Sequence, residues 1–297
     1  MTSAEMTPSP ILLCCDLDRT LIPNGAQPES PDTRPRFRAL CAHPGIHLVM
    51  VSGRHIELVL DAIDQWDLPE PDYIIGDVGT TIYTHPEPEE GPPDSWAMWR
   101  SWAAELGPDW NGMTHNDITD LFSDIKAIVP QPIDRQGVFK ASYFVDIDTN
   151  LEILEAELVR RLWQLGINAR LIWSVDEAAH TGLLDVLPAS ASKLHAIEFL
   201  SATQHYPMAR TVFAGDSGND LEVLGSHIQS VLVANAPEDV RARALALVES
   251  ADVAHSLYLA RGGLFGMNGN YAAGVLEGLA HFLPETLPWM QLEQTSH

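Results

Sequence analysis

The sequence predicts an α/β fold in which a Rossmann-like, doubly wound parallel sheet carries an inserted α+β domain. Short apolar runs alternate with helix-like segments, as in parallel strands joined by crossover helices; the runs lie at 11–15, 46–51, 73–75, 211–214 and 230–234. The stretch from Thr84 to Gly182, between the third and fourth runs, has helix and strand patterns of its own. We therefore expect a core made of residues 1–83 and 183–297, and a second domain over residues 84–182.

The first apolar run, Ile11 to Cys15, is too short to span a membrane and follows Pro10, so we interpret it as a buried parallel strand. Asp16 and Asp18 come directly after it. In an extended chain, side chains two positions apart point to the same face, so one ligand can meet both carboxylates. Alone, an Asp-x-Asp pair is also common on solvated surfaces.

The second run, Ile46 to Val51, leads into Ser52-Gly53-Arg54 and then a predicted helix over 55–65. Taken alone, this triplet is typical of an ordinary turn and helix N-cap. Its position adds a second interpretation, because parallel sheets bind ligands at the carboxyl ends of their strands.

The inserted stretch is expected to contain helices over 95–106, 116–128 and 151–165, and strands over 138–146, 170–175 and 183–187. Trp96, Trp99 and Trp102 lie at helical spacing in the first of these helices. We interpret them as core residues rather than a sugar-binding platform, because this spacing describes any amphipathic helix. Lys140 is a candidate substrate contact and equally an exposed strand lysine.

The fourth run, Thr211 to Ala214, ends in Gly215-Asp216-Ser217-Gly218-Asn219-Asp220, whose later residues resemble a helix start. Asp216 and Asp220 lie four positions apart and can face one cavity. Carboxylates at paired strand ends indicate metal-dependent phosphoryl transfer, because Mg²⁺ is held by carboxylates together with phosphate oxygens. A carboxylate can also carry an aspartyl phosphate. Plain loop chemistry is the alternative interpretation of this turn.

Together these motifs resemble those of the haloacid dehalogenase-like phosphatases, whose pattern is DxDxT, then Ser or Thr after a strand, then Lys, then GDxxxD. The chain matches in that order with Asp16-Leu17-Asp18-Arg19-Thr20, Ser52, Lys193 and Gly215-Asp216-Ser217-Gly218-Asn219-Asp220. Lys193 alone is uninformative, because exposed lysines in helices are common. The order of the motifs and their strand contexts favour the functional interpretation.

The resemblance implies catalytic roles for four residues. Asp16 would be the nucleophile, and Asp18 the general acid and then the general base. Ser52 would donate a hydrogen bond to the phosphoryl group. Lys193 would balance charge on the nucleophile and the phosphoryl group.

The resemblance also implies a magnesium site and substrate contacts. Mg²⁺ would bind Asp16, Asp216 and the backbone carbonyl of Asp18. Asp220 and Asn219 would orient the metal or its waters. We expect Arg54, Lys140 and Asn219 to be the substrate-binding residues.

A narrower resemblance is to the sucrose-phosphate phosphatases, and it covers most of the chain, through segments 73–83, 139–143, 182–188, 233–236 and 271–282. The insertion matches the α/β cap of these enzymes and of the Cof-like phosphatases, which closes over the active site and selects the leaving group. The resemblance implies that residues 84–182 form an α+β cap domain. It also implies a small-molecule sugar phosphate as substrate, such as sucrose 6-phosphate or a related glycosyl compatible-solute phosphate.

Two alternatives stay open. One is a promiscuous Cof-like phosphatase for sugar or nucleotide phosphates. The other is a non-catalytic module that binds a phosphorylated ligand and partners a glycosyltransferase of the same pathway.

Two features depart from the sucrose-phosphatase pattern. Arg19 stands where relatives commonly have Asn, and the glycine-rich segment 261–270 is longer than expected before the last helix. We interpret this segment as an ordinary flexible connector, because no strand leads cleanly into a GxGxxG phosphate-binding pattern. Both features are expected near the substrate mouth and bear on the choice of sugar.

Composition limits partners and location. Asp plus Glu number 41 and Lys plus Arg number 17, so the net charge of −24 argues against binding nucleic acid or an anionic membrane. A phosphorylated substrate must then be attracted by a local cluster of Mg²⁺, Lys193 and Arg54 or Arg19. Three cysteines, two of them adjacent in a predicted strand, fit reduced thiols. Because the sequence shows no signal peptide and no long apolar run, we expect a cytoplasmic protein without membrane contacts.

Overall fold

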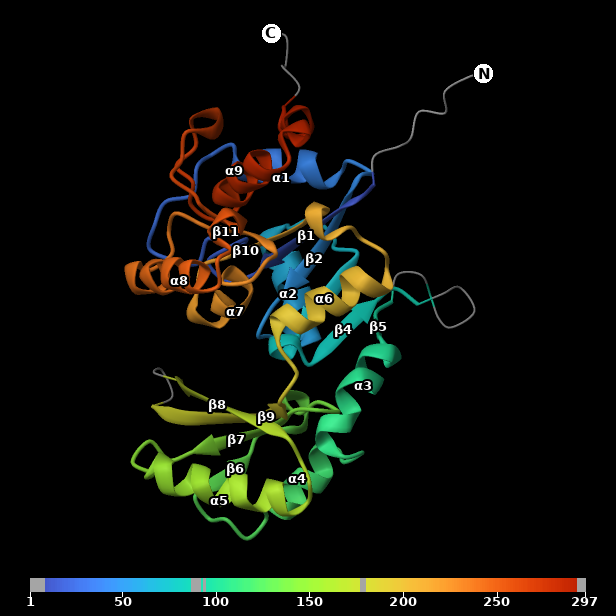
Figure 1. The fold of residues 1–297 in the computed structure, drawn as a ribbon, viewed down its shortest axis with the longest axis vertical. Coiled ribbons are helices and arrows are strands. Elements are labelled where there is room, and N and C mark those ends of the chain that lie inside the picture. Colours follow the sequence, from blue (N-terminus) through green and yellow to red (C-terminus); the bar gives the residue numbers. More distant parts are fainter. Residues whose placement is uncertain (1–8, 87–91, 93–94, 177–179, 293–297) are drawn as a thin grey trace.

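The computed structural model describes residues 9–86, 92, 95–176 and 180–292. Figure 1 shows two sheets, one in each half of the long axis. In the described part of the chain the larger sheet has eight strands and the smaller has four. The predicted α/β class is confirmed, because parallel strands with helices on both sides form the larger body.

The larger sheet has the order β12-β11-β10-β1-β2-β3-β4-β5. Its strands pair in parallel except for β4 and β5, which are antiparallel to their neighbours. The strands are β1 (Ile11–Asp16), β2 (Ile46–Val51), β3 (Tyr73–Gly76), β4 (Thr81–Thr84), β5 (Ala97–Met98), β10 (Thr211–Gly215), β11 (Gln229–Leu232) and β12 (Leu257–Leu259).

Every residue of β1 is buried, because helices cover both faces of this sheet. Alternate side chains of the strand therefore enter different cores. Ile11, Leu13 and Cys15 join the core with α1 (Thr33–Cys41), α2 (Ile56–Trp66) and α9 (Ala272–Phe282). Leu12 and Cys14 join the opposite core, which contains α3 (Arg100–Leu106), α6 (Lys193–Thr203), α7 (Leu221–Leu224) and α8 (Glu238–Ser250).

The smaller sheet has the order β6-β7-β9-β8 and is antiparallel throughout. Helices α4 and α5 pack on one face, and Figure 1 shows them on the side away from the larger sheet. The elements are α4 (His115–Leu121), β6 (Ile128–Pro130), β7 (Ala141–Val145), α5 (Leu151–Gln164), β8 (Ala169–Asp176) and β9 (Thr181–Pro188). Among the described helices, none combines the length and the apolar character that crossing a bilayer requires.

Several boundaries differ from the sequence predictions, and the helix predicted over 116–128 ends at Leu121 because residues from Ile128 form β6. Strand β9 pairs with β8 as far as Pro188, so the smaller sheet extends past residue 182. We therefore propose that the second domain ends after Pro188. The helix predicted over 95–106 begins only at Arg100, because Ala97 and Met98 pair with β4 as an edge strand. Of the three tryptophans assigned to that helix, only Trp102 lies in it, and its side chain is buried.

The strand order also indicates where a ligand site is expected. From β1 the chain adds β2 and β3 on one side and β10, β11 and β12 on the other, so the order reverses between β1 and β10. A crevice opens outside the carboxyl ends of parallel strands at such a reversal. Asp16 ends β1, and Asp216 follows Gly215 at the end of β10.

Candidate active site

Lys193, the first residue of α6, holds the acidic residues of this crevice together. Its Nζ lies 2.7 Å from Asp16 Oδ1, 2.7 Å from Asp220 Oδ1 and 3.1 Å from Asn219 Oδ1. The side chains of Lys193, Asp16 and Asp220 are buried, so these are desolvated, charge-assisted hydrogen bonds. Four residues singled out in the sequence therefore meet at one point.

The cluster is electrostatically costly. Burial raises the pKa of Asp16 from 3.8 to about 8 despite the nearby Lys193 ammonium, and the carboxylates of Asp220 and Asp216 add to the rise. Burial, followed by the Asp220 charge, raises the pKa of Asp216 to about 6. Burial alone would lower the pKa of Lys193, but the carboxylates of Asp16 and Asp220 raise it above its ordinary value. A further positive charge would favour the ionised carboxylates.

The residues present fit a divalent cation. One oxygen from each of Asp16, Asp216 and Asp220 lies within 4.8 Å of the others. Asp216 Oδ2 is buried and accepts no hydrogen bond from any described residue; Arg19 Nε is 3.4 Å away. Asp216 Oδ1 faces the Thr20 hydroxyl at 3.4 Å. A buried carboxylate oxygen without a donor, beside two other carboxylates, has the chemistry that hard cations prefer.

Asp220 closes the loop that carries Asp216. Its Oδ2 accepts hydrogen bonds from the backbone N–H groups of Asp216, at 3.1 Å, and Ser217, at 3.0 Å, as well as from the Ser217 hydroxyl. Gly215 is required here because a Cβ would lie 2.6 Å from the Asp220 carboxyl carbon. Both oxygens of Asp220 are thus occupied, and the residue holds the loop and Lys193 in place.

Asp18 is held by different partners. Arg54 donates to both of its oxygens, with Nε to Oδ2 at 2.8 Å and Nη2 to Oδ1 at 2.6 Å. The amide of Asn24 also donates to Oδ1 at 2.8 Å. This bidentate geometry fixes the orientation of the Asp18 carboxylate, and each of its oxygens already accepts at least one hydrogen bond. Sequence reasoning missed Asn24, for which the Pro23-Asn24-Gly25 turn, two residues after the motif, was the available signal.

Ser52 is buried at the end of β2, and its Oγ accepts from the Arg54 amide at 3.1 Å. No described residue accepts the hydroxyl proton, so Ser52 remains available as a donor. A cavity of about 330 Å³ opens over these groups; its lining includes Asp16, Asp18, Arg19, Ser52, Arg54, Asp216 and Asn219. The two predicted acidic motifs and the serine motif therefore face one space.

Arg19 lines this cavity with a half-exposed side chain. Its backbone is left-handed, with φ of 59°, and its N–H donates to Asn24 Oδ1 at 2.9 Å. Asn235, which follows β11, holds the backbone of Arg19 by donating a hydrogen bond from its side-chain amide to the Arg19 carbonyl at 2.7 Å. Arg19, which departs from the sucrose-phosphatase pattern, is thus held at the opening of the cavity. Sequence reasoning did not single out Asn235 for this role.

Segment 261–270 does not contribute to the cavity lining. Glu277 of α9 accepts from the backbone N–H groups of Arg261, at 2.9 Å, and Gly262, at 2.8 Å, so the segment is fixed at its start by a buried carboxylate. The end of the segment lies close to the mouth nonetheless, because the Gly269 carbonyl accepts from the Ala234 N–H at 3.0 Å, next to Asn235, which holds Arg19.

Lys140 stands apart from the acidic cluster. It precedes β7 in the smaller sheet, and its Nζ lies 3.0 Å from Asp77 Oδ1 in the larger body. Both residues are buried. Farther along β7, the Ser142 hydroxyl donates to Asp185 of β9 at 2.5 Å. Sequence reasoning missed Asp77, Ser142 and Asp185, although all three lie in the segments that resemble sucrose-phosphate phosphatases.

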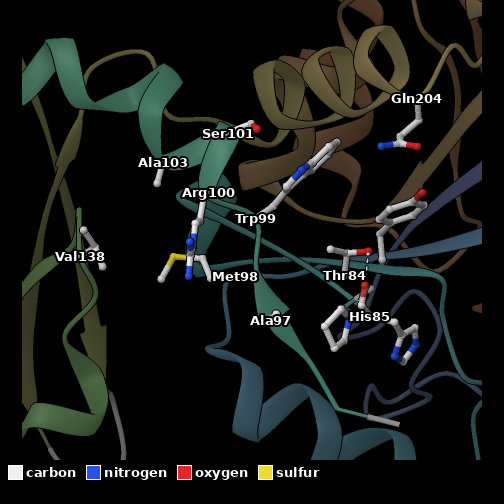
Figure 2. Close-up of a pocket in the computed structure, with 12 residues that line it drawn as sticks. Thr84, His85, Ala97, Met98, Trp99, Arg100, Ser101, Ala103, Val138 and Gln204 are labelled. Carbon is white, nitrogen blue, oxygen red and sulfur yellow. Dashed lines mark hydrogen bonds between the residues drawn. The ribbon is translucent and has the colours of Figure 1, made fainter. Parts of the chain in front are cut away.

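A larger cavity of about 890 Å³ lies along edge strand β5. Figure 2 shows Trp99, Arg100, Met98 and Gln204 around it. The described residues that line it include none of the predicted site residues and no carboxylate for acid–base or metal chemistry. The smaller, charged cavity is therefore the candidate active site.

The chain is similar to known proteins over most of its length. A family model described as sucrose-6F-phosphate phosphohydrolase matches residues 9–283. A HAD-like hydrolase of Nitrosococcus oceani is 51% identical over 281 residues, covering 95% of this chain and 74% of that protein. A mannosylfructose-phosphate phosphatase of Agrobacterium fabrum is 30% identical over 276 residues, covering 91% of this chain and 96% of that protein.

The fold has a counterpart among solved structures. The sucrose-phosphatase of Synechocystis sp. PCC6803, in complex with sucrose and phosphate, has a TM-score of 0.63 at 24% identity and covers 92% of this chain and 98% of that chain. At this identity the likeness shows that the two chains share a fold.

Proposed function

Because this chain belongs to the sucrose-6F-phosphate phosphohydrolase family of haloacid dehalogenase-like phosphatases, we propose that it hydrolyses a disaccharide phosphate or related glycosyl phosphate through an aspartyl-phosphate intermediate. The observation that carries the proposal is the Lys193 cluster, in which one buried ammonium contacts Asp16 and Asp220. An ammonium in this position neutralises charge on a carboxylate nucleophile and on an incoming phosphoryl group.

Asp16 is the proposed nucleophile. One of its oxygens attacks phosphorus in line with the leaving sugar oxygen, so that the new O–P bond forms as the sugar O–P bond breaks. Lys193 donates a hydrogen bond to Asp16 Oδ1 and so restrains the Asp16 carboxylate. Ser52, whose hydroxyl proton has no described acceptor, donates to a phosphoryl oxygen.

Asp18 is the proposed acid and base. It gives a proton to the leaving sugar oxygen and then takes one from the water that hydrolyses the aspartyl phosphate. Arg54 and Asn24 occupy both Asp18 oxygens, so we expect Arg54 to turn toward the substrate phosphate when substrate binds. That movement frees the carboxyl for proton transfer and gives Arg54 its substrate contact.

Mg²⁺ would be held by Asp16 and Asp216, with the backbone carbonyl of Asp18, and when bound it would neutralise charge on the phosphoryl oxygens. The unpartnered Asp216 Oδ2 and the raised pKa values of Asp16 and Asp216 support this assignment. Asp220 and Asn219 would orient the metal or its waters, and both accept a hydrogen bond from Lys193.

The smaller sheet is the proposed cap that selects the leaving sugar. On its strands β7 and β9, the Ser142–Asp185 pair supplies polar groups of the kind that bind hydroxyl groups, while Lys140, directly before β7, is held by Asp77. Selection by a site built to bind hydroxyls is stronger than selection by apolar fit, because a missing hydroxyl leaves buried polar groups unpaired.

Among disaccharide phosphates, mannosylfructose phosphate and sucrose 6-phosphate are the first candidates. The mannosylfructose-phosphate phosphatase is the named relative whose length this chain matches over 96%. A glycosyltransferase must supply such a substrate, and it remains our proposed pathway partner. A cytoplasmic location likewise stays a prediction from the sequence.

The function is tested by phosphate release from a panel with and without Mg²⁺: sucrose 6-phosphate, mannosylfructose phosphate, glucosylglycerol phosphate, hexose phosphates and an aryl phosphate. We expect Mg²⁺-dependent turnover with at least about tenfold preference in kcat/KM for one glycosyl phosphate, equivalent to about 1.4 kcal/mol. Weak, even activity across the panel would favour the promiscuous Cof-like alternative. Binding of these ligands without any release would favour the non-catalytic module.

A further inference from the structure

We propose that Asp77 is a positioning residue that fixes the smaller sheet over the active site by holding Lys140, and that it thereby controls selection of the leaving group. The inference rests on the proposed function and adds to it a residue outside the matched catalytic motifs. Its basis is a buried ion pair between the two bodies and a strained turn that connects this pair to the catalytic loops.

The turn from Asp77 to Gly79, between β3 and β4, has three consecutive residues in the left-handed region. The φ angles are 51° at Asp77, 59° at Val78 and 93° at Gly79. For a β-branched residue such as Val78 this conformation is a genuine outlier. Such backbones persist only where surrounding contacts determine them, and they are concentrated at functional sites.

The contacts that hold the turn come from the catalytic machinery. The Asp77 amide donates to the Arg54 carbonyl at 2.9 Å, and the Val78 amide donates to the Ser52 carbonyl at 3.1 Å. Gly79 packs so closely against the backbone of Ser192 that a Cβ on Gly79 would overlap the Ser192 carbonyl. Ser192 directly precedes Lys193. The turn thus touches the serine motif and the start of the lysine helix.

The carboxylate of Asp77 points from this turn toward the smaller sheet. Its Oδ1 accepts from Lys140 Nζ at 3.0 Å, and its Oδ2 accepts from the Thr81 hydroxyl at 3.2 Å. The two side chains retain only 7% and 11% of their accessible surface, for Asp77 and Lys140 respectively. Removing one partner of a buried pair leaves an uncompensated charge, so the pair strongly restrains the position of Lys140.

A second ion pair between the bodies gives a contrast. Arg170 of β8 faces Glu222 of α7 at 3.5 Å, but both side chains are partly exposed. An exposed pair contributes little to position because solvent screens it and both side chains are mobile. Of these two pairs, the Asp77–Lys140 pair is therefore the one expected to set the relation of the cap to the site.

The test compares Asp77→Asn with Glu222→Gln as the matched control. Asn tolerates a left-handed backbone, so Asp77→Asn keeps the turn while removing the charge. We measure kcat/KM for the best glycosyl phosphate and for an aryl phosphate, whose leaving group makes few cap contacts. Asp77→Asn should lower the ratio of the two by about 10–100-fold, since small misplacements far from the chemistry have effects of that size. Glu222→Gln should change the ratio by less than about threefold.

A double variant separates coupling from independent damage. Because Asp77→Asn leaves the Lys140 ammonium unpaired, adding Lys140→Gln should cause no further loss in the ratio. Losses that multiply, or an equal loss toward both substrates in Asp77→Asn, would overturn the positioning role.

Hydrogen exchange keeps this inference separable from the phosphatase proposal. If the wild type hydrolyses no substrate in the panel, the proposed function fails, but the ion pair can still be tested. Asp77→Asn should speed amide exchange in both 77–81 and 137–142 by at least about tenfold, whereas Glu222→Gln should not, because only the former unpairs a buried charge. Unchanged exchange in Asp77→Asn would contradict the inference.

Discussion

The ammonium of Lys193 lies 2.7 Å from Asp16 Oδ1, although 177 positions separate the two residues in the chain. The contact joins the end of β1 to the start of α6, and the same ammonium reaches Asp220 in the loop after β10. One buried cation therefore balances carboxylates from two strand ends, and the stability of the crevice should depend on it.

Replacing Lys193 tests this dependence. Lys193→Met leaves the buried carboxylates of Asp16 and Asp220 without their partner, and we expect the free energy of unfolding without Mg²⁺ to fall by about 3–5 kcal/mol. Chemical denaturation provides the measurement. Lys126→Met, at an exposed lysine of the smaller body, should change stability by less than about 0.5 kcal/mol. Equal effects of the two substitutions would show that the buried contact has no special importance.

The pKa values of Asp16 and Asp216 predict how stability varies with pH. Both are raised in the folded, metal-free protein, from 3.8 to about 8 and about 6. The unfolded chain then releases these protons at lower pH than the folded chain, so the free energy of unfolding should fall as pH rises from about 4 to about 8.

Mg²⁺ should remove this loss, because a bound cation favours the ionised carboxylates. Thermal or chemical unfolding at pH 5 and pH 8, with EDTA or with saturating Mg²⁺, measures the effect. We expect Mg²⁺ to stabilise the protein more at pH 8 than at pH 5, by an amount on the order of 2 kcal/mol. The same stabilisation at both pH values would argue against a cation at these carboxylates.

Much of the site could be predicted from the sequence, because short motifs at strand ends are local. Asp16, Ser52 and Asp216 each follow a buried apolar run, and parallel strands bring their carboxyl ends to one edge. The fold class was predictable for the same reason. The chain reversal between β1 and β10 could not be read from periodicity, which carries no information about strand order.

Other features depend on contacts across the two bodies and were missed. Asp77 lies in a segment whose only local signal is a glycine turn, and its partner Lys140 belongs to the other body, 63 positions away in the chain. The error at the start of α3 has a similar cause. The tryptophan spacing suggested a helix from residue 95, but pairing with β4 draws Ala97 and Met98 into a strand.

The close approach of Gly79 to α6 predicts a severe alanine substitution. Gly79 and Gly112 both have left-handed backbones, with φ of 93° and 78°, but only at Gly79 would a Cβ strike backbone atoms. Gly112→Ala should cost about 1–2 kcal/mol of stability, which is the conformational penalty alone. Gly79→Ala should cost at least about 2 kcal/mol more and should lower kcat, because α6 carries Lys193. Equal destabilisation would mean that the turn does not restrain α6.

Asp18→Asn tests the acid–base assignment. An aryl phosphate has a good leaving group that needs little protonation, whereas a sugar oxygen needs a proton. We expect kcat for the glycosyl phosphate to fall by about 10²–10⁴-fold. With the aryl phosphate, rapid-quench measurements should show a burst of released phenol followed by slow turnover, because hydrolysis of the intermediate lacks its base. If Asp18→Asn turned over both substrates as fast as the wild type, this role for Asp18 would be ruled out.

The most direct test of the account is to trap the phosphorylated enzyme. Turnover of the preferred substrate with Mg²⁺ is quenched rapidly, the protein is reduced with borohydride, which converts an aspartyl phosphate to homoserine, and peptides are sequenced by mass spectrometry. The account predicts homoserine at Asp16, none in a sample without substrate, and none in Asp16→Asn, whose turnover should be lower by at least about 10³-fold. Label at another carboxylate, or an Asp16→Asn variant that retains most of its activity, would contradict the assignment of Asp16 as the nucleophile.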